Sequence, residues 1–565
     1  MRKFTLVTSI CIVALGFGCA SQAGPSVDLF DDSGKKSGRT PQENDFFHAQ
    51  GTQIVDGTGT PVLLRGVAFG NNVWGNPALA PDNHHEEKDY RYAAEMGFNT
   101  IRFYLNYRIF EDDSTPYSYK QSGFDWINQN LVWAKKYGIH LILNMHFPQG
   151  GFQSQGDGDA LWKNKNNQKR FIALWKEIAR RYADEPQIIG YDLLNEPIVT
   201  KTITQWETLA RETVRAVREV DDRHCIFIER MNANKAAGDS SWDPDQNGAM
   251  NFFLIHDHNI VYEFHCYVPM TFSHQDVPWI PSLIGIRTSW PDPDKKITFG
   301  SALWKWSTFE NPVLPSGTSD WAWYEGVPVA ASKDEWTVGR LALQADALAS
   351  GTAFFDDVIL TERDPSGKIV STKRYSFDFD QGFDYWSEPV SGSRKWNPAT
   401  GRDGAGCWSA TGSRSSAVIA DSNGLIRVTA GNTYTVSGWM KGTKIPKDAT
   451  ARLRLDFLFS DGPVYSWNKE YLAAEIARYA AFGTKHDVPL YLGEFGCVQA
   501  AFDQGGLEWV SDIIDICDEK GISYNYHTWH EQHFGIFTNY AHLKTTKDEA
   551  NLPLIELFTT KHQLK

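Results

Sequence analysis

The sequence contains little cysteine for its length, with 7 cysteines in 565 residues. Two lie near the amino terminus, and five follow at wide, irregular spacing: Cys225, Cys266, Cys407, Cys497 and Cys517. An odd number without a repeated spacing excludes a disulfide framework and a cysteine-based metal knuckle. We expect most of these five thiols to be buried.

An excess of positive charge is also missing, because 55 basic residues stand against 69 acidic ones, for a net charge of −14. Nothing would neutralise phosphates, so a nucleic-acid partner is not expected. Long apolar runs are absent as well: the longest, from Phe4 to Phe17, is too short to span a bilayer stably. The chain therefore has the composition of a soluble globular protein.

The amino terminus has the pattern of an export signal, with Arg2 and Lys3 before the apolar run. Two processing sites compete: Ser21 to Ala23 permits ordinary cleavage, and Gly18 followed by Cys19 resembles a bacterial lipoprotein site. The sequence thus predicts a signal peptide over 1–23, or a lipoprotein signal ending at 18. The product is either secreted or a cell-envelope lipoprotein whose only membrane attachment is a lipid on Cys19. The polar residues 24–45 read as a flexible spacer, and nothing indicates an oligomeric state.

Aromatic residues are what the chain has in abundance, with 21 Trp, 22 Tyr and 33 Phe. Such rings stack on the flat apolar faces of sugars, although the packing of a large core also explains many of them.

Past residue 60, short apolar runs alternate with helical patterns, which indicates parallel strands joined by helices. Eight such runs are present: 61–69, 99–105, 139–146, 187–194, 224–229, 260–267, 488–495 and 522–529. Eight is the strand number of a closed (β/α)8 barrel of the TIM type, so the fold class is α/β.

Between the sixth and seventh runs, helical periodicity stops and short alternating runs separated by Gly, Ser, Asp and Pro take over. This pattern is typical of an all-β sandwich or jelly roll inserted after strand 6. We therefore predict a catalytic barrel formed by residues 46–284, with strands one to six, and residues 463–565, with strands seven and eight. The inserted β-sandwich is predicted between them, at 285–462.

Polar residues fall at the carboxyl ends of the barrel strands, where such barrels carry their active sites. Asn195 and Glu196 follow strand four in the sequence YDLLNEP, and Glu494 ends strand seven in YLGEFG. Two facing carboxyl groups are what glycoside hydrolysis needs, one as proton donor and one as nucleophile.

These motifs make the barrel resemble glycoside hydrolase family 5, the cellulase-like retaining β-glycanases. Eight residues match the active-site positions of the family: Arg102, His146, Asn195, Glu196, His265, Tyr267, Glu494 and Trp529. The resemblance covers the barrel, around three fifths of the chain, and leaves the insert out. It implies a polysaccharide substrate and no cofactor for catalysis.

The resemblance also implies a role for each position. Glu196 is the expected acid/base and Glu494 the expected nucleophile, which Arg102 and the Tyr267 hydroxyl hold ionised. Asn195 is expected to bond the sugar 2-hydroxyl. Two histidines, His146 and His265, are expected to line the reacting subsite, and Trp529 to form its stacking floor. A barrel-core ion pair for Arg102 and core hydrogen bonds for the histidines are the structural alternatives.

Further aromatic and histidine residues follow the strands. Trp74, Trp162 and Trp279 are candidate platforms for additional sugar units, with Trp74 ranked first because it directly follows strand one. The run from His84 to Glu87 is better explained as a solvated helix start than as a metal site. Near Trp529, the histidines at 527, 530 and 533 suggest sugar contacts or simple exposure.

The insert carries three segments that resemble those of carbohydrate-binding modules, in rotated order: GTAFFDDVIL (351–360), FDFDQGFDYW (377–386) and AGNTYTVSGWMKG (430–442). A circularly permuted, module-like jelly roll is the resulting hypothesis, with 353–360 and 375–380 as neighbouring strands. Similar modules hold a structural calcium, for which Asp357 and Asp380 are candidates. The sandwich is expected beside the catalytic face, where it binds polysaccharide or shapes the cleft.

The sequence therefore predicts a retaining O-glycosyl hydrolase that cleaves β-linked polysaccharide, foremost β-glucan. A β-mannanase or another β-glycan hydrolase of the same family is the alternative within enzymes. A non-hydrolytic carbohydrate-binding protein on a barrel scaffold is the alternative of another class.

Overall fold

The structure is a computed structural model. It describes residues 46–74, 85–237, 245, 247–280, 283–299, 302–331, 336–377, 383–385, 394–412, 419–421, 425–538 and 545–563. The signal and spacer predictions at 1–45 lie outside the described residues. Within the described ranges, no helix is both long and apolar enough to cross a membrane.

Eight parallel strands close into a barrel in the order β10-β26-β27-β3-β4-β5-β6-β8. They are β3 (Arg65–Phe69), β4 (Thr100–Asn106), β5 (His140–Phe147), β6 (Ile188–Asp192), β8 (Cys225–Glu229), β10 (Ile260–His265), β26 (Leu490–Phe495) and β27 (Ser523–Tyr526). The predicted (β/α)8 barrel is confirmed, and the eight strands follow the eight predicted runs.

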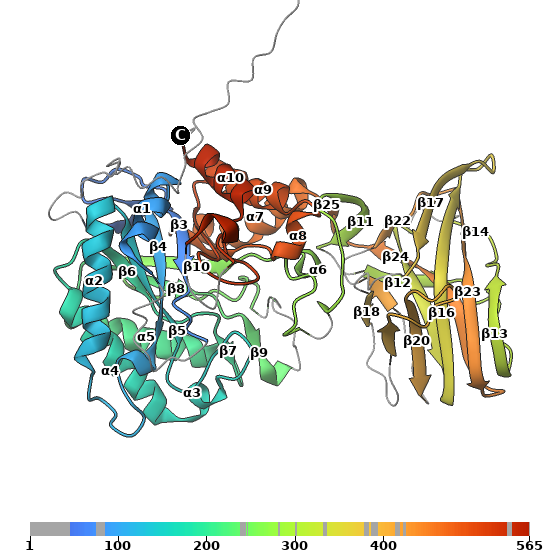
Figure 1. Ribbon diagram of the computed structural model, residues 1–565, viewed down its shortest axis with the longest axis horizontal. Coiled ribbons are helices and arrows are strands. Elements are labelled where there is room, and N and C mark those ends of the chain that lie inside the picture. Colours follow the sequence, from blue (N-terminus) through green and yellow to red (C-terminus); the bar gives the residue numbers. More distant parts are fainter. Residues whose placement is uncertain are drawn as a thin grey trace, which may run out of the picture.

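Helices surround the barrel (Figure 1). The longer ones are α1 (Glu87–Glu95), α2 (Gln121–Tyr137), α4 (Lys165–Tyr182), α5 (Thr204–Arg218), α7 (Lys469–His486), α9 (Gly506–Lys520) and α10 (Leu552–Gln563). Three are short: α3 (Asp159–Lys163), α6 (Met270–Ser273) and α8 (Gln499–Phe502). Local signals set their ends: Asn468 accepts a hydrogen bond from the Tyr471 N–H at the start of α7, and Gly138, with φ 69°, ends α2.

A small hairpin, β1 (His48–Gln50) and β2 (Gln53–Val55), covers the amino-terminal end of the barrel. Phe47 and Ile54 pack in one cluster with Ile142, Ile189 and Phe227, which come from three barrel strands. The hairpin therefore closes the end of the barrel opposite to the strand tips, and the tips are left for the site.

Between β10 and β26, the chain forms antiparallel sheets of a different kind. A four-stranded sheet runs in the order β12 (Ala302–Ser307), β24 (Thr450–Ser460), β15 (Val338–Asp346), β22 (Ile426–Arg427). A larger sheet has the path β13 (Gly317–Tyr324), β23 (Thr433–Ile445), β16 (Ala349–Arg363), β20 (Cys407–Gly412), β19 (Arg394–Asn397). Two strands pair off this path: β14 (Val329–Ala330) with β23, and β17 (Ile369–Tyr375) with β16. Among the described residues, the segment also forms two antiparallel pairs: β18 (Phe383–Tyr385) with β21 (Ile419–Asp421), and β11 (Asp292–Thr298) with β25 (Val464–Trp467). In the barrel part, β7 (Ile198–Val199) pairs in parallel with β9 (Ala233–Asn234).

The two larger sheets share a separate hydrophobic core, in which Phe355, Met440 and Trp408 from one sheet meet Leu455 and Phe457 from the other. This sandwich stands beside the barrel, and the ribbon β11–β25 joins the two (Figure 1). The ribbon rests on α7, because the Phe299 ring contacts Tyr471 and lies under the guanidinium of Arg478. How far the sandwich shapes the cleft stays a prediction.

The permutation hypothesis required strands at 353–360 and 375–380 to be neighbours. Strand β16 pairs antiparallel with β17, and Val358 lies opposite Tyr375. Residues 378–380 lie outside the described residues, so the hypothesis and the exact boundaries of the insert stay predictions.

Candidate active site

Glu494, on β26, is held by three donors. Its Oε1 accepts hydrogen bonds from Arg102 Nη1 and from the Tyr104 hydroxyl, both at 2.7 Å, and its Oε2 accepts from the Tyr267 hydroxyl at 2.8 Å. Burial alone would raise the pKa of Glu494, but the positive charge on His265 and Arg102 lowers it well below the usual value. Glu494 is therefore an ionised, oriented carboxylate.

Arg102, on β4, is fully buried and joins four strands. Its Nε donates to Asp192 at 2.7 Å, its Nη2 lies 2.9 Å from Glu263 Oε1, and the same Nη2 donates to Asn195 Oδ1 at 3.1 Å. A planar guanidinium with five donors suits this convergence. Arg102 thus forms ion pairs in the barrel core and also binds Glu494, so it fills both of the roles that were considered for it.

Glu196 follows β6 and has a backbone φ of 45°, in the left-handed region that few non-glycine residues adopt. Its N–H donates to Glu229 Oε2 at 2.6 Å, which holds this conformation from the tip of β8. Its side chain is 10% exposed, and Oε1 lies 3.0 Å from His265 Nδ1. Oxygens of Glu196 and Glu494 lie within 4.8 Å of each other and of a ring nitrogen of His265.

His265 lies between the two glutamates, with Nδ1 also 3.7 Å from Glu494 Oε2. Its Nε2 faces Glu263 Oε1 at 3.3 Å and Glu229 Oε2 at 3.6 Å. Burial alone would lower the pKa of His265, but Glu229, Glu494 and the other carboxyl groups around it raise it well above the usual value. A charged imidazolium can donate from both nitrogens at once.

A layer of buried carboxyl groups supports the two glutamates from below: Asp192, Glu229 and Glu263, each with no exposed surface. Burial, countered by Arg102 and reinforced by Glu263, raises the pKa of Asp192 to about 8. Burial also raises the pKa of Glu229 well above its usual value. The physical cause is a shortage of cations, because ionising every carboxyl group around Arg102 and His265 would leave excess negative charge in an apolar interior.

His146, at the end of β5, stacks on the Tyr104 ring with centroids 3.9 Å apart. Burial lowers the pKa of His146 well below its usual value, so the ring is neutral, and Nδ1 lies 3.1 Å from Asn144 Oδ1. Burial raises the pKa of both Tyr104 and Tyr267 well above 10, so both hydroxyls keep their protons as donors to Glu494.

Trp529 does not form the stacking floor, and this prediction is wrong. Its side chain is fully buried, packs against Phe69 and Phe537, and donates from Nε1 to Asp89 at 3.2 Å. Strand β27 ends at Tyr526, so the residue at its tip is His527, whose Nδ1 lies 3.0 Å from the Tyr104 hydroxyl. The site therefore presents an imidazole where the resemblance implied an indole.

Of the three other tryptophans predicted as platforms, two reach solvent and one is buried. Trp74 is partly exposed and lies beside His146 and His527, with ring centroids 6.0 and 6.3 Å away. Trp279 is 39% exposed and meets the His533 ring edge-on. Trp162 is buried and donates from Nε1 to Gln153, so its assignment as a platform is wrong.

Two predictions concern metals. His85 is buried and stacked on Phe69, so a solvated helix start is wrong for this residue. With Asp89 and His530 it offers ligand atoms within 4.8 Å of one another, but Asp89 Oδ1 already accepts hydrogen bonds from Trp529 and Thr545. In the sandwich, Asp357 pairs with Arg374 and Arg402, which gives calcium no support there, and Asp380 lies outside the described residues.

Four residues of the site were missed by the sequence predictions: Tyr104, Asp192, Glu229 and Glu263. A signal for two of them was present, because Tyr104 is two residues from Arg102 and Glu263 two residues from His265, and alternate residues of a strand share a face. Counting every second residue from the strand tip back into the barrel would have found Tyr104 and Glu263.

Comparison with known proteins agrees with this geometry. Residues 55–311 match the family model for Cellulase (glycosyl hydrolase family 5). Endoglucanase C of Acetivibrio thermocellus is 36% identical over 201 residues, which are 36% of this chain and 55% of that protein. Cellodextrinase A of Ruminococcus flavefaciens is 30% identical over 215 residues, 38% of this chain and 60% of that protein. The chain thus spans little more than half the length of these relatives.

A solved structure of Thermotoga maritima Cel5A with cellobiose aligns over 88% of this chain and 97% of that one, at 15% identity and a TM-score of 0.47. The family match covers β3 to β10 and ends in the first strands of the insert, so Glu494 lies beyond it. In the closed barrel, β26 pairs with β10, and Glu494 lies opposite His265. Glu494 is therefore next to the residues that the family model matches. Over residues 55–311, the barrel of this chain is therefore similar to glycosyl hydrolase family 5.

Proposed function

We propose that the chain hydrolyses β-linked polysaccharide with retention of anomeric configuration, with Glu494 as nucleophile and Glu196 as acid/base. The observation that carries this proposal is the spacing of the pair, because oxygens of Glu196 and Glu494 lie within 4.8 Å. Retaining glycosidases need a separation of about 5–5.5 Å, whereas inverting ones leave about 6.5–9.5 Å for a water molecule.

In the first step, Glu196 gives its proton to the glycosidic oxygen while Glu494 attacks the anomeric carbon. The bond from that carbon to the leaving oxygen breaks, and a covalent glycosyl-enzyme forms on Glu494. As the negative charge of Glu494 is consumed, Arg102, Tyr104 and Tyr267 keep its two oxygens oriented.

In the second step, Glu196, now a carboxylate, takes a proton from water, and the water oxygen attacks the anomeric carbon. The bond to Glu494 breaks, and both glutamates return to their starting states. His265 serves both steps from one position, because its Nδ1 is 3.0 Å from Glu196 and 3.7 Å from Glu494. It stabilises the negative charge on whichever carboxylate carries it.

We propose β-glucan as the substrate, since the relatives are an endoglucanase and a cellodextrinase. Trp74 beside His146 and His527 offers one apolar ring and two hydrogen-bonding imidazoles for a sugar unit. β-Mannan stays the alternative because the catalytic positions do not read the sugar. The predicted signal supports export of this activity from the cytoplasm, either as a secreted protein or as a lipoprotein attached through Cys19.

Purified full-length protein should be assayed on cellulose, mixed-linkage β-glucan, xyloglucan and β-mannan, with product sizes recorded. Glu494→Gln and Glu196→Gln should each abolish turnover while soluble glucan still binds. Turnover above all on mannan would replace the substrate, and binding without turnover of any polymer would favour the non-hydrolytic alternative. Glu310→Gln, an exposed glutamate of the sandwich, is the matched control.

A further inference from the structure

One face of the larger sheet in the sandwich carries aromatic side chains toward solvent. Trp323 on the edge strand β13 lies opposite Trp439 on β23, and Asp356 on β16 lies opposite Trp439 from the other side. Side chains of residues directly paired across a sheet share a face, and so do alternate residues of one strand. Trp321 and Phe354 therefore lie on this face too, and their ring centroids are 6.3 Å apart. We call Trp321, Trp323, Phe354 and Trp439 the aromatic face.

The opposite face of the same strands is the core of the sandwich. Phe355 and Met440, the neighbours of Phe354 and Trp439, are 1% and 0% exposed, whereas Trp323 is 39% exposed. Packing in the core thus explains the presence of Phe355 and Met440, but it does not explain the large rings of the aromatic face. Four large rings gathered on the solvent side of one sheet mark a binding surface.

The rings are held in place from within the protein. The Trp323 ring meets the Trp439 ring edge-on with centroids 5.9 Å apart, and its Nε1 donates to Glu325 at 2.8 Å. The guanidinium of Arg402 lies over Trp439, 4.7 Å from the ring centroid. Binding to a fixed ring costs less conformational entropy than binding to a free one.

Polar groups surround the aromatic face in balanced pairs. Lys441 follows Trp439 by two residues on β23, and its Nζ lies 3.4 Å from Asp320. Arg402, whose backbone N–H donates to Asp356, pairs with Asp357 at 3.4 Å. The face thus offers hydrogen-bond donors and acceptors without a net charge of one sign, which suits a neutral ligand rich in hydroxyl groups.

We propose that the aromatic face binds a chain of the β-linked glycan that the barrel hydrolyses, with Trp321 and Trp323 as stacking platforms. The two rings are two residues apart on one strand, a spacing of about 7 Å. They can therefore contact successive units of one extended chain. This inference rests on the proposed function for the identity of the glycan, and on the sandwich geometry alone for the existence of the site.

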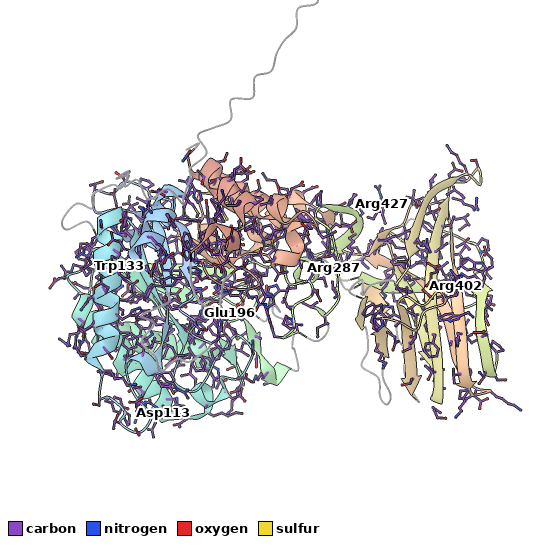
Figure 2. The ribbon with its side chains drawn as sticks, in the orientation of Figure 1. Asp113, Trp133, Glu196, Arg287, Arg402 and Arg427 are labelled. Atoms are coloured by element: carbon purple, nitrogen blue, oxygen red, sulfur yellow. The ribbon has the colours of Figure 1, made fainter. Side chains whose placement is uncertain are left out.

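A second copy of the chain fits the face less well. Aromatic side chains bury about 150–250 Å² each, so four half-buried rings offer well below the about 800 Å² per partner of a standard interface. The sandwich stands beside the barrel, and β13 lies on the side of the sandwich away from it (Figure 1; Arg402 in the sandwich and Glu196 in the barrel are labelled in Figure 2).

The test compares full-length proteins in native gels that contain soluble β-glucan, xyloglucan or glucomannan, all with Glu494→Gln so that no polymer is cut. We expect Trp321→Ala with Trp323→Ala to weaken retardation about tenfold or more, which corresponds to about 1.4 kcal/mol. Trp304→Ala is the matched control, because Trp304 is 49% exposed on β12 of the other sheet. Trp323→Tyr should retain a measurable share of the binding.

Unchanged retardation in the double variant overturns the proposal. So does a loss of binding accompanied by a change of oligomeric state in sedimentation, because the face would then join two copies. A parallel measurement uses the intact Glu494 and a short aryl β-glycoside that the cleft alone can hold. Here the double variant should keep its kcat/KM, and a chain that turns over no glycoside at all would refute the proposed function and leave the binding result standing.

Discussion

The barrel and the sandwich each bury a network of charged groups, and the two networks differ in their balance. In the sandwich, the carboxylate of Asp456 has no exposed surface and accepts hydrogen bonds from Arg340, Arg454 and Ser307. In the barrel, five carboxyl groups share one arginine and one histidine. Where cations outnumber carboxyl groups, each carboxylate stays ionised. Where carboxyl groups outnumber cations, some of them keep a proton, and that proton can be transferred between neighbouring groups.

This difference in charge balance indicates that acid/base catalysis takes place in the barrel and not in the sandwich. In the barrel, burial raises the pKa of Asp192, the surrounding carboxyl groups raise that of His265, and nearby positive charge lowers that of Glu494. These groups lie at the strand tips or directly beneath them. Opposite shifts on neighbouring groups are what acid/base catalysis needs. The same kind of bond in the sandwich serves stability, and the following substitutions separate the two roles.

The largest expected effect is that of Glu494→Gln, which removes the nucleophile. We expect kcat to fall by about 10⁴-fold or more, while the midpoint of thermal unfolding changes little. Initial rates on soluble glucan measure the first quantity and calorimetry the second. A variant that keeps a tenth of its activity would contradict the assignment.

Arg102→Lys is expected next in size. Lysine cannot reach Asp192, Glu263, Glu494 and Asn195 together, so we expect kcat to fall by about 10²–10³. The free energy of unfolding should also fall, by about 3–5 kcal/mol, because buried carboxyl groups lose their partner.

Arg374→Lys in the sandwich is the matched control for Arg102→Lys. Its side chain is 60% exposed beside Asp357, and exposed ion pairs contribute about 0–1 kcal/mol. Equal losses in the two variants, measured by denaturant unfolding, would contradict the contrast between the networks.

Asp456→Asn tests the network of the sandwich alone. Two buried arginines lose their counter-charge, so we expect the sandwich to be destabilised by about 3–5 kcal/mol. kcat on a short aryl glycoside should stay unchanged, since Asp456 lies outside the barrel. Asp448→Asn, at an exposed aspartate, should change neither quantity, and a fall of kcat in Asp456→Asn would show that the networks are coupled.

Glu263→Gln has the smallest expected effect, on pH dependence. Carboxylates around His265 raise its pKa, so removing one should lower it and move the alkaline limb of the kcat/KM profile down by about one unit. The stability that this histidine contributes is present below about pH 6.5 and is lost as pH rises through its raised pKa, so the variant should lose it earlier. Glu362→Gln, a partly buried glutamate of the sandwich, should leave the profile where it is.

Sequence periodicity was enough to predict the barrel, and the resemblance to glycoside hydrolase family 5 named eight site residues. The structure brings seven of these together, because the strand tips of a closed barrel meet in one place. Trp529 failed for a local reason: β27 ends at Tyr526, so Trp529 no longer follows the alternation of the strand and turns into the core. A strand end cannot be read from apolar character when the next residues are also aromatic.

In the sandwich, the sequence pattern predicted an all-β fold but not which strands pair or in which register. The register of β16 against β23 shifts between Asp356 and Ile359, and this irregularity decides which side chains reach solvent. Such a bulge leaves no pattern in a single sequence. The aromatic face therefore became visible only in the structure.

The stereochemistry of the first product tests the central claim most directly. Proton NMR of a β-glucan oligosaccharide during the first minutes of hydrolysis distinguishes the two anomers before they equilibrate. Because oxygens of Glu196 and Glu494 lie within 4.8 Å of each other, we predict that the β anomer appears first. Initial release of the α anomer would contradict double displacement on Glu494.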